Sequence, residues 1–325
     1  MHATRQPLLL LLITLAALVA AAFVRRAVAG FFPAEEPLLF STALGSRVGG
    51  WQLAWPRMAR VAAGLLLAGT ALTAGRIAVR YNLSANGALL AIPLCAAASC
   101  GMFLSGDCLL YALAAWFLAR AVRCYCLSFR NEYTFSHLFR GSLYLGLLPL
   151  LSVPLLPLTA LLPVALLLFK RTFREGIVAL SGALLPFLTA CYLSWACGGS
   201  FTEPFDRTAD MLAAAPRLHL FAGQPVVVLL QLLWWLSGVL CAVFVFLSNP
   251  YAFSTRARAV LTFVLWTMVG AGASFFLPGA STGLFMAAAF PASLLLPLLF
   301  MKMRPLYADL LYGSLLVLTF LRLVL

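Results

Sequence analysis

Apolar residues run along this chain in long blocks, and short links of charged or polar residues separate the blocks. A block of about 20 apolar residues is long enough to cross the hydrocarbon core of a bilayer as a helix. Blocks of this length predict helices over residues 7–24, 58–75, 87–104, 108–125, 176–196, 225–247, 259–277, 282–300 and 306–325. We therefore expect an all-α polytopic integral membrane protein.

The block at 141–169 departs from this pattern, because it is too long for one plain helix and too short for two full spans. Pro149, Pro154 and Pro157 interrupt it, and a proline inside a helix removes a donor and clashes one turn back. Two half-length helices that meet near Pro154 fit this length. With this broken pair we expect about 10–11 membrane segments.

The links between the blocks predict the orientation of the helices, because cytoplasmic loops are enriched in Lys and Arg. Links poor in basic residues, or rich in acids, lie at 101–107, 197–224 and 278–281. The basic links hold Arg76 and Arg80, Arg120 to Arg140, Lys170 to Arg174, Arg256 and Arg258, and Lys302 and Arg304. We expect the basic links and the N-terminus in the cytoplasm, and 141–169 leaves and returns to that side.

Composition supports a membrane protein and removes a competing interpretation of the charge. The 325 residues are 64% hydrophobic and 10% charged, whereas soluble domains are nearer a quarter charged. A net charge of +13 would suggest nucleic acid in a soluble protein. Here the basic residues sit in short links, so they indicate topology and contact with anionic membrane lipids, with no nucleic-acid partner.

Three acids outside the blocks are candidates for chemistry. Glu35 and Glu36 follow the first block and Asp107 follows the third, so all three are expected at the outer face. Carboxylates that converge there can hold Mg²⁺ or Mn²⁺, which prefer hard oxygen ligands, and a free carboxylate can act as a general base. The alternative is that these acids are simply solvated. Farther along, Pro204 and Asp206 precede an amphipathic run that predicts a short helix over about 206–214.

The first outer loop reads "AEEPLLFSTALGSRVGGWQLAWPR", with Glu35, Glu36, Gly50, Trp51 and Pro56. It resembles the corresponding loop of GT-C-type membrane glycosyltransferases, which carries an acidic pair, an apolar stretch, a Gly-Asp-Trp-like turn and a proline. "SGDCLLYALAAWFLARA" is similar to the Asp-initiated fourth helix of these enzymes, and "FRGSLYLGLLPLLSVPLLPLTALLPVALLLFKR" to their broken helix pair. The order of these motifs carries the resemblance over roughly residues 1–196.

This resemblance implies a role for each candidate residue. Glu36 and Asp107 would serve a divalent metal or the acceptor, and Glu35 is a further catalytic candidate. Arg47, Trp51 and Arg57 of the same loop are assigned to substrate binding. The family pair usually starts with Asp where this chain has Glu35, and the usual Lys after the Gly-rich helix is missing.

A second resemblance covers most of the chain. Gly141 through Leu148, "FKRTFREGIVALSGALLP" and the closing "AAFPASLLLPLLF" resemble a bacterial family of multi-spanning membrane proteins labelled Domain of Unknown Function 6427. This resemblance implies a location in the bacterial inner membrane. It does not indicate any particular activity.

Together these observations predict a GT-C-like transmembrane module at 1–196, followed by an outer loop and four transmembrane helices at 197–325. The expected function is transfer of a sugar, or a related group, from a polyprenyl-phosphate donor at the outer face of the inner membrane. A catalytically inactive protein of this class is one alternative. A lipid or solute carrier and a non-catalytic scaffold for envelope assembly, with protein partners unknown, are the others.

Overall fold

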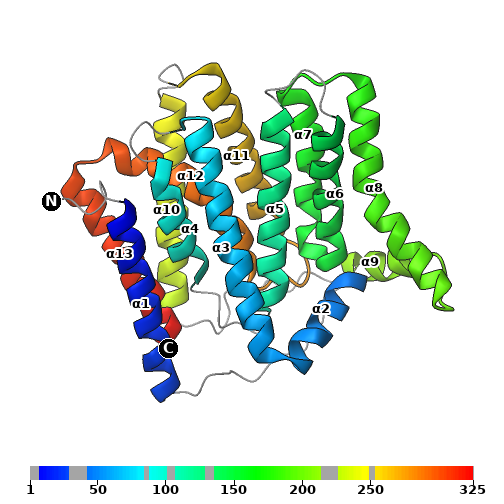
Figure 1. Ribbon diagram of the computed structural model, residues 1–325, viewed down its shortest axis with the longest axis horizontal. Helices are drawn as coiled ribbons and strands as arrows, with labels where there is room; N and C mark the ends of the chain where they lie inside the picture. The colour runs from blue at the N-terminus through cyan, green and yellow to red at the C-terminus, as the bar shows by residue number, and fades with distance from the viewer. Residues whose placement is uncertain are drawn as a thin grey trace.

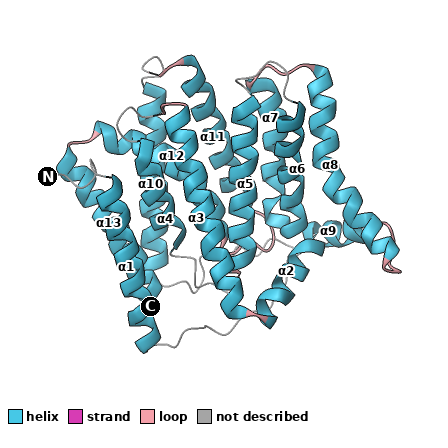
Figure 2. Cartoon of the chain, in the orientation of Figure 1, coloured by secondary structure: helices cyan, strands magenta, loops and turns pink. Residues whose placement is uncertain are grey.

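The structure is a computed structural model that describes residues 7–28, 42–83, 88–100, 107–128, 135–213, 226–248 and 253–324. Within these ranges the chain is almost entirely helical and forms no strand, as Figure 2 shows. The predicted all-α class is therefore confirmed. Glu35 and Glu36, and their predicted convergence with Asp107, lie outside the described residues or depend on them.

The helices follow the apolar blocks of the sequence. In chain order they are α1 (Pro7–Val28), α2 (Ala43–Ala54), α3 (Pro56–Arg80), η2 (Ala88–Leu90), α4 (Ala91–Cys100), α5 (Cys108–Ser128), α6 (Phe135–Leu151), η3 (Val153–Ala160), α7 (Leu161–Leu168), α8 (Phe173–Ala196), α9 (Glu203–Ala213), α10 (Val226–Ser248), α11 (Thr255–Ser274), α12 (Leu284–Lys302) and α13 (Pro305–Val324). Within the described ranges, α3, α5, α8, α10, α11 and α12 are long and apolar enough to cross a membrane. These six helices fit a multi-pass membrane protein.

Helix α12 forms the centre of the bundle. It packs against α3, α4, α5, α10, α11 and α13, and every residue from Leu284 to Phe300 is buried. A helix that is apolar on all sides is enclosed by other helices or by lipid. Here 94% of the most apolar stretch of α12 is buried inside the protein, so other helices enclose it. Figure 1 shows α1 and α13 at one edge of the bundle and α8 at the other.

The predicted broken pair is present, but its arms are longer than half a membrane. Helix α6 descends through the bundle, the chain turns at Ser152, and η3 and α7 return to the same end (Figure 1). The 17 residues of α6 cover about 25 Å at 1.5 Å each. The eight residues of η3 and eight of α7 cover about 28 Å, because a 3₁₀ helix rises about 2 Å per residue. Each arm thus crosses most of a core of about 30 Å.

Small residues allow α6 to approach its two neighbours closely. A Cβ added to Gly146 would overlap the backbone carbonyl of Ala183 on α8, and one added to Gly182 would lie 2.7 Å from the backbone oxygen of Phe139. On the α5 side, a Cβ on Gly141 would lie 3.2 Å from the Cβ of Cys124. Membrane helices use such residues where their backbones meet. Glycines on α6 and α8 therefore set the position of α8.

The basic stretch between α7 and α8 is a compact pair of helix caps. Lys170 has a left-handed φ of 50°, and Arg171 N donates to Leu166 O at 2.9 Å, which closes the end of α7. At the start of α8, Thr172 N donates to Glu175 Oε2 at 2.9 Å, as in a capping box. Arg171 Nη1 pairs with Glu175 Oε1 at 3.1 Å. The stretch therefore fixes a helix–helix turn in addition to carrying positive charge.

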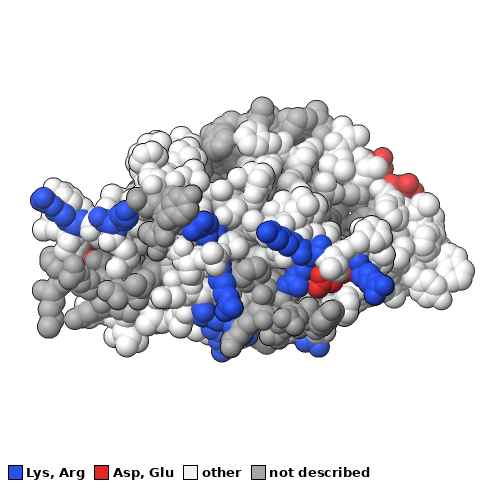
Figure 3. Space-filling view, turned by 90° about the horizontal axis from the view of Figure 1, so that it is seen from above, with Lys and Arg blue, Asp and Glu red and all other residues white. Residues whose placement is uncertain are grey.

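The basic links lie together at one end of the bundle. The end of α3, the α5–α6 and α7–α8 links, the start of α11 and the α12–α13 link are at the upper end in Figure 1, and the start of α1 is at this end too. Figure 3 looks down on this end and shows Lys and Arg side chains distributed over it. Helices α2 and α9 are at the opposite end (Figure 1). We call these two ends the basic end and the α2–α9 end.

This arrangement makes a topology measurement informative. A reporter fused after Arg174 is expected to read cytoplasmic, and a reporter fused after Asp206 is expected to read as outside, because positive links are retained in the cytoplasm. Paired fusions with alkaline phosphatase and green fluorescent protein measure both positions. If both fusions report the same side, then α8 does not cross the membrane and the outer-face assignment of α9 is wrong.

Candidate functional site

A buried hydrogen bond fixes the start of α2 against the end of α6. Thr42 Oγ1 donates to Pro149 O at 3.0 Å, and Thr42 is 2% exposed. The last carbonyls of a helix lack donors from within the helix, and Pro149 is in the last turn of α6. The threonine supplies this missing donor. It also places the first turns of α2, which carry Ser46 and Arg47, beside the broken helix pair.

A tight turn places α9 beside α8. Gly198 has a left-handed φ of 89°, which glycine adopts without steric cost, and Gly199 N donates to Ser194 O at 3.0 Å. Ser194 Oγ then donates to Glu203 Oε2 at 2.6 Å. The predicted short helix is confirmed, and it begins at Glu203 rather than Asp206, because Glu203 joins its first turn.

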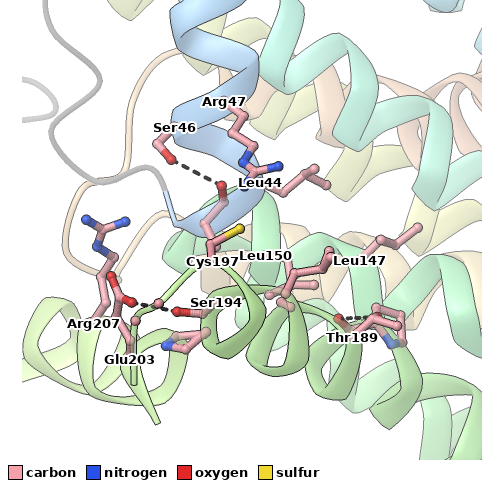
Figure 4. Close-up of a pocket in the computed structure, with 17 residues that line it drawn as sticks. Leu44, Ser46, Arg47, Leu147, Leu150, Thr189, Ser194, Cys197, Glu203 and Arg207 are labelled. Atoms are coloured by element: carbon pink, nitrogen blue, oxygen red, sulfur yellow. Dashed lines mark hydrogen bonds between the residues drawn. The ribbon is translucent and has the colours of Figure 1, made fainter. Parts of the chain in front are cut away.

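These elements enclose a cavity of about 550 Å³ at the α2–α9 end. This α2–α9 cavity is lined by residues of α2, α6, α8 and α9 and of the α8–α9 turn, which are Ala43, Leu44, Ser46, Arg47, Leu147, Leu150, Pro186, Thr189, Ala190, Leu193, Ser194, Cys197, Gly198, Gly199, Glu203, Pro204 and Arg207. Its volume is within the range of about 300–1,000 Å³ typical of ligand sites. Figure 4 shows that Arg47 comes from α2 and Arg207 from α9, with their guanidinium groups apart in this view.

The charges of the cavity suit a phosphate group. Arg47 and Arg207 contribute two guanidinium groups and Glu203 one carboxylate, and among the described residues neither arginine forms an ion pair. Guanidinium groups bind phosphate oxygens through paired hydrogen bonds. The wall from α6 and α8 is largely apolar. The cavity therefore combines cationic groups with a surface for an apolar chain.

The predicted site residues do not all meet in this cavity. Arg47 lines it, whereas Trp51 is 43% exposed and, like the exposed Arg57, does not line it. Asp107 is in the turn before α5 and its carbonyl accepts from Tyr111 N at 3.2 Å. It does not line the cavity either. The assignments of Trp51 and Arg57 to substrate binding stay predictions.

Asp107 lies beside a different polar group. It acts electrostatically on Tyr111, whose hydroxyl interacts with the side chains of Ser152 and Ser281. In the part of the chain that the structure describes, no three His, Cys, Asp or Glu residues are grouped to hold a metal ion. Because Glu35 and Glu36 lie outside that part, the predicted site for Mg²⁺ or Mn²⁺ at Glu36 and Asp107 stays a prediction.

Sequence reasoning did not assign Glu203, Arg207 or Ser194 to the site. Part of the signal was available, because Arg207 is on the predicted helix over about 206–214. Glu203, four residues earlier, shares its face only because the observed helix begins at Glu203. No pattern in the sequence indicates that this face meets α2. Comparisons of the chain with protein-family models, with curated proteins and with solved structures found no match.

Proposed function

We propose that the chain binds a polyprenyl-phosphate-linked sugar, or a related lipid-linked group, at the outer face of the inner membrane. The observation that carries this proposal is the α2–α9 cavity, whose lining combines Arg47 and Arg207 with mostly apolar residues of α6 and α8. The phosphate would bind between the two arginines. The isoprenoid chain would leave along α8.

The exposed surface of α8 supports this path. Leu188 and Leu193 are 49% and 55% exposed, and Leu193 also lines the cavity. In a membrane such an apolar face is in contact with lipid tails, so a lipid can pass from the bilayer into the cavity without crossing water. A water-soluble phosphate ester would gain nothing from this apolar route. The geometry thus favours a lipid-linked ligand over a soluble one.

A transfer reaction would use Glu203 of the cavity and the carboxylates predicted for the outer face. Glu203 is positioned by the Ser194 hydroxyl at 2.6 Å, so it can accept a proton from an acceptor hydroxyl as a general base. Glu36 and Asp107 stay the proposed ligands for Mg²⁺ or Mn²⁺, which would neutralise charge on the phosphate leaving group. In this proposal Arg47 and Arg207 bind the donor, and the carboxylates act on the acceptor and the metal.

A carrier without chemistry is the second candidate, and one feature favours it. The cavity adjoins the break between α6 and η3 and includes the hydroxyls of Ser46, Thr189 and Ser194. Broken helices and hydroxyl groups form the binding sites of many transporters. A carrier would need the same arginines but no general base.

Glu203→Gln separates the two candidates. A transferase is expected to keep its binding of polyprenyl phosphate and to lose about a hundredfold or more in turnover, which is typical when a general base is removed. Binding by the full chain in nanodiscs and sugar transfer in the same sample measure both quantities. Asp210→Asn is the matched control, because Asp210 is on the same helix but does not line the cavity.

The same assay tests the phosphate proposal itself. The parent chain is expected to bind polyprenyl phosphate and to discriminate against the uncharged polyprenol. Equal binding of both lipids would show that the arginines do not recognise phosphate, and the proposed function would then be wrong. Retained turnover in Glu203→Gln would exclude Glu203 as the base without affecting the binding proposal.

A further inference from the structure

A stripe of large and basic side chains runs along one face of α5. Trp116, Arg120 and Arg123 are spaced by four and three residues, so they lie on one side of the helix. All three are half-buried, and α5 packs against α3 and α6. On the α6 side, Phe117 stacks on Tyr144 with ring centroids 5.8 Å apart. This face is at a distance from the α2–α9 cavity, which none of these residues lines.

Arg120 is placed unusually deep for a charged side chain. Its guanidinium carbon lies 5.4 Å from the centroid of the Trp116 ring, one turn toward the start of α5. Helical side chains point toward the N-terminus of their helix, so Arg120 points away from the basic end. Its Nε is buried and has no hydrogen-bond partner among the residues that the structure describes. The ring contact therefore does not satisfy all the donors of Arg120 among the described residues.

Among the described residues, the charged side chains that act on this stripe are arginines. Arg120, Arg76 and Arg80 are close enough to repel the Arg123 guanidinium electrostatically. Arg120, Arg123 and Arg140 are likewise close enough to interact electrostatically with the neighbouring Cys124 thiol. In neither set does a described carboxylate contribute. We call these five residues, Arg76, Arg80, Arg120, Arg123 and Arg140, the arginine cluster. It is formed by α3, α5 and α6.

Such a cluster at the edge of a bilayer attracts an anion. Like charges repel, which raises the free energy of the folded protein. Desolvating a cation without a nearby counter-charge raises it further. The cytoplasmic leaflet supplies anionic headgroups at this depth, and basic pockets between membrane helices bind them. The ring cluster of Trp116, Phe117 and Tyr144 adjoins the arginines on the side of the hydrocarbon core. An acyl chain therefore has an apolar surface directly beside the phosphate position.

We propose that the arginine cluster binds the phosphate of an anionic phospholipid at the basic end, with Arg123 contacting the phosphate, Arg120 between the phosphate and the Trp116 ring, and an acyl chain on the ring cluster. This site is independent of the proposed function, because it lies at the other end of the helices. Free inorganic phosphate offers the same charge but no acyl chain. A lipid is the ligand that uses both parts of the surface.

The test uses the full chain purified in a zwitterionic detergent. Phosphatidylglycerol is expected to raise the thermal midpoint in a saturable way, whereas phosphatidylcholine and inorganic phosphate at matched concentrations are not. In Arg120→Gln/Arg123→Gln, the phosphatidylglycerol concentration that gives half of this stabilisation is expected to rise about tenfold or more, since charge-assisted hydrogen bonds are lost. Arg174→Gln/Arg304→Gln is the matched control, because it removes two exposed cations from the same end.

A second measurement reports on position and does not depend on the stability of the variant. Phosphatidylglycerol with brominated acyl chains is expected to quench the fluorescence of Trp116 more strongly than brominated phosphatidylcholine does. The contribution of Trp116 is obtained as the difference in quenching between the parent and Trp116→Phe. Equal quenching by the two lipids would overturn the proposal. Equal losses in the two double variants would also overturn it, because general attraction to the basic end would then explain the binding. A response to inorganic phosphate alone would show an ion site and contradict the lipid assignment.

Discussion

Arg47→Gln/Arg207→Gln is expected to bind polyprenyl phosphate about a hundredfold more weakly than the parent, or worse. Each guanidinium would form a charge-assisted hydrogen bond worth about 1.5–3 kcal/mol, and about 1.4 kcal/mol corresponds to a factor of ten in affinity. Each single variant is expected to lose about tenfold or more on the same basis. Titration of the lipid into nanodiscs that contain the full chain measures these losses.

Arg57→Gln decides between the cavity and the sequence-based assignment of Arg57 to substrate binding. Arg57 is an exposed arginine near the α2–α9 end that does not line the cavity, so its removal leaves the contacts proposed for the cavity unchanged. Its affinity is expected to stay within about twofold of the parent, as for a surface charge. If Arg57→Gln weakens binding as much as Arg207→Gln, the phosphate is not held in the cavity. The first outer loop would then be the binding element.

Gly146→Ala is expected to destabilise the protein, although alanine is the better helix former. A Cβ at this position would overlap the carbonyl of Ala183, and a backbone atom cannot rotate away as a side chain can. Overpacking of this kind costs about 1–3 kcal/mol or more. Because Pro186, Thr189 and Leu193 of α8 line the cavity, a displaced α8 is expected to weaken lipid binding as well.

Gly313→Ala is the matched control and is expected to have the opposite sign. A Cβ on Gly313, in the interior of α13, meets nothing within 4 Å, so the substitution is expected to stabilise the helix by up to about 1 kcal/mol. Unfolding in a titration with sodium dodecyl sulfate measures both variants. Equal stability of Gly146→Ala and Gly313→Ala would show that α6 and α8 do not depend on close contact at Gly146.

Six of the predicted helices have the length and composition of a membrane span within the described ranges, and they could be predicted because each depends on its own composition. The predicted 87–104 is instead the short α4 after a 3₁₀ turn. Helix α10 (Val226–Ser248) matches the predicted 225–247 closely, since a long apolar run has few alternatives in a bilayer. Helix α2 was not predicted. Its sequence, "ALGSRVGGWQLA", contains three glycines, which disfavour a helix. Contacts distant in sequence, such as that of Thr42 with Pro149, stabilise it and leave no local signal.

The cavity was less predictable than the helices, for a related reason. Arg47 could be assigned from the first outer loop, but its partner Arg207 comes from an element about 160 residues later, a distance at which a single sequence carries no contact information. The position of α9 depends on how far α8 is from α6, which Gly146 and Gly182 determine. The prolines predict a break near Pro154, and the structure places it at Ser152. They do not predict the 3₁₀ geometry that follows the break, which lengthens the second arm.

The central position of α12 has a consequence for how the protein is made. Helices α3, α4 and α5 leave the ribosome well before α12, yet α12 occupies the space between them and α10, α11 and α13. During synthesis the sides of α3, α4 and α5 that later contact α12 must be shielded by lipid or by the insertion machinery. Assembly is therefore completed only late in translation. A chain that stops after α11 is expected to be inserted but recognised by quality-control proteases, because its missing centre leaves the earlier helices without their common partner.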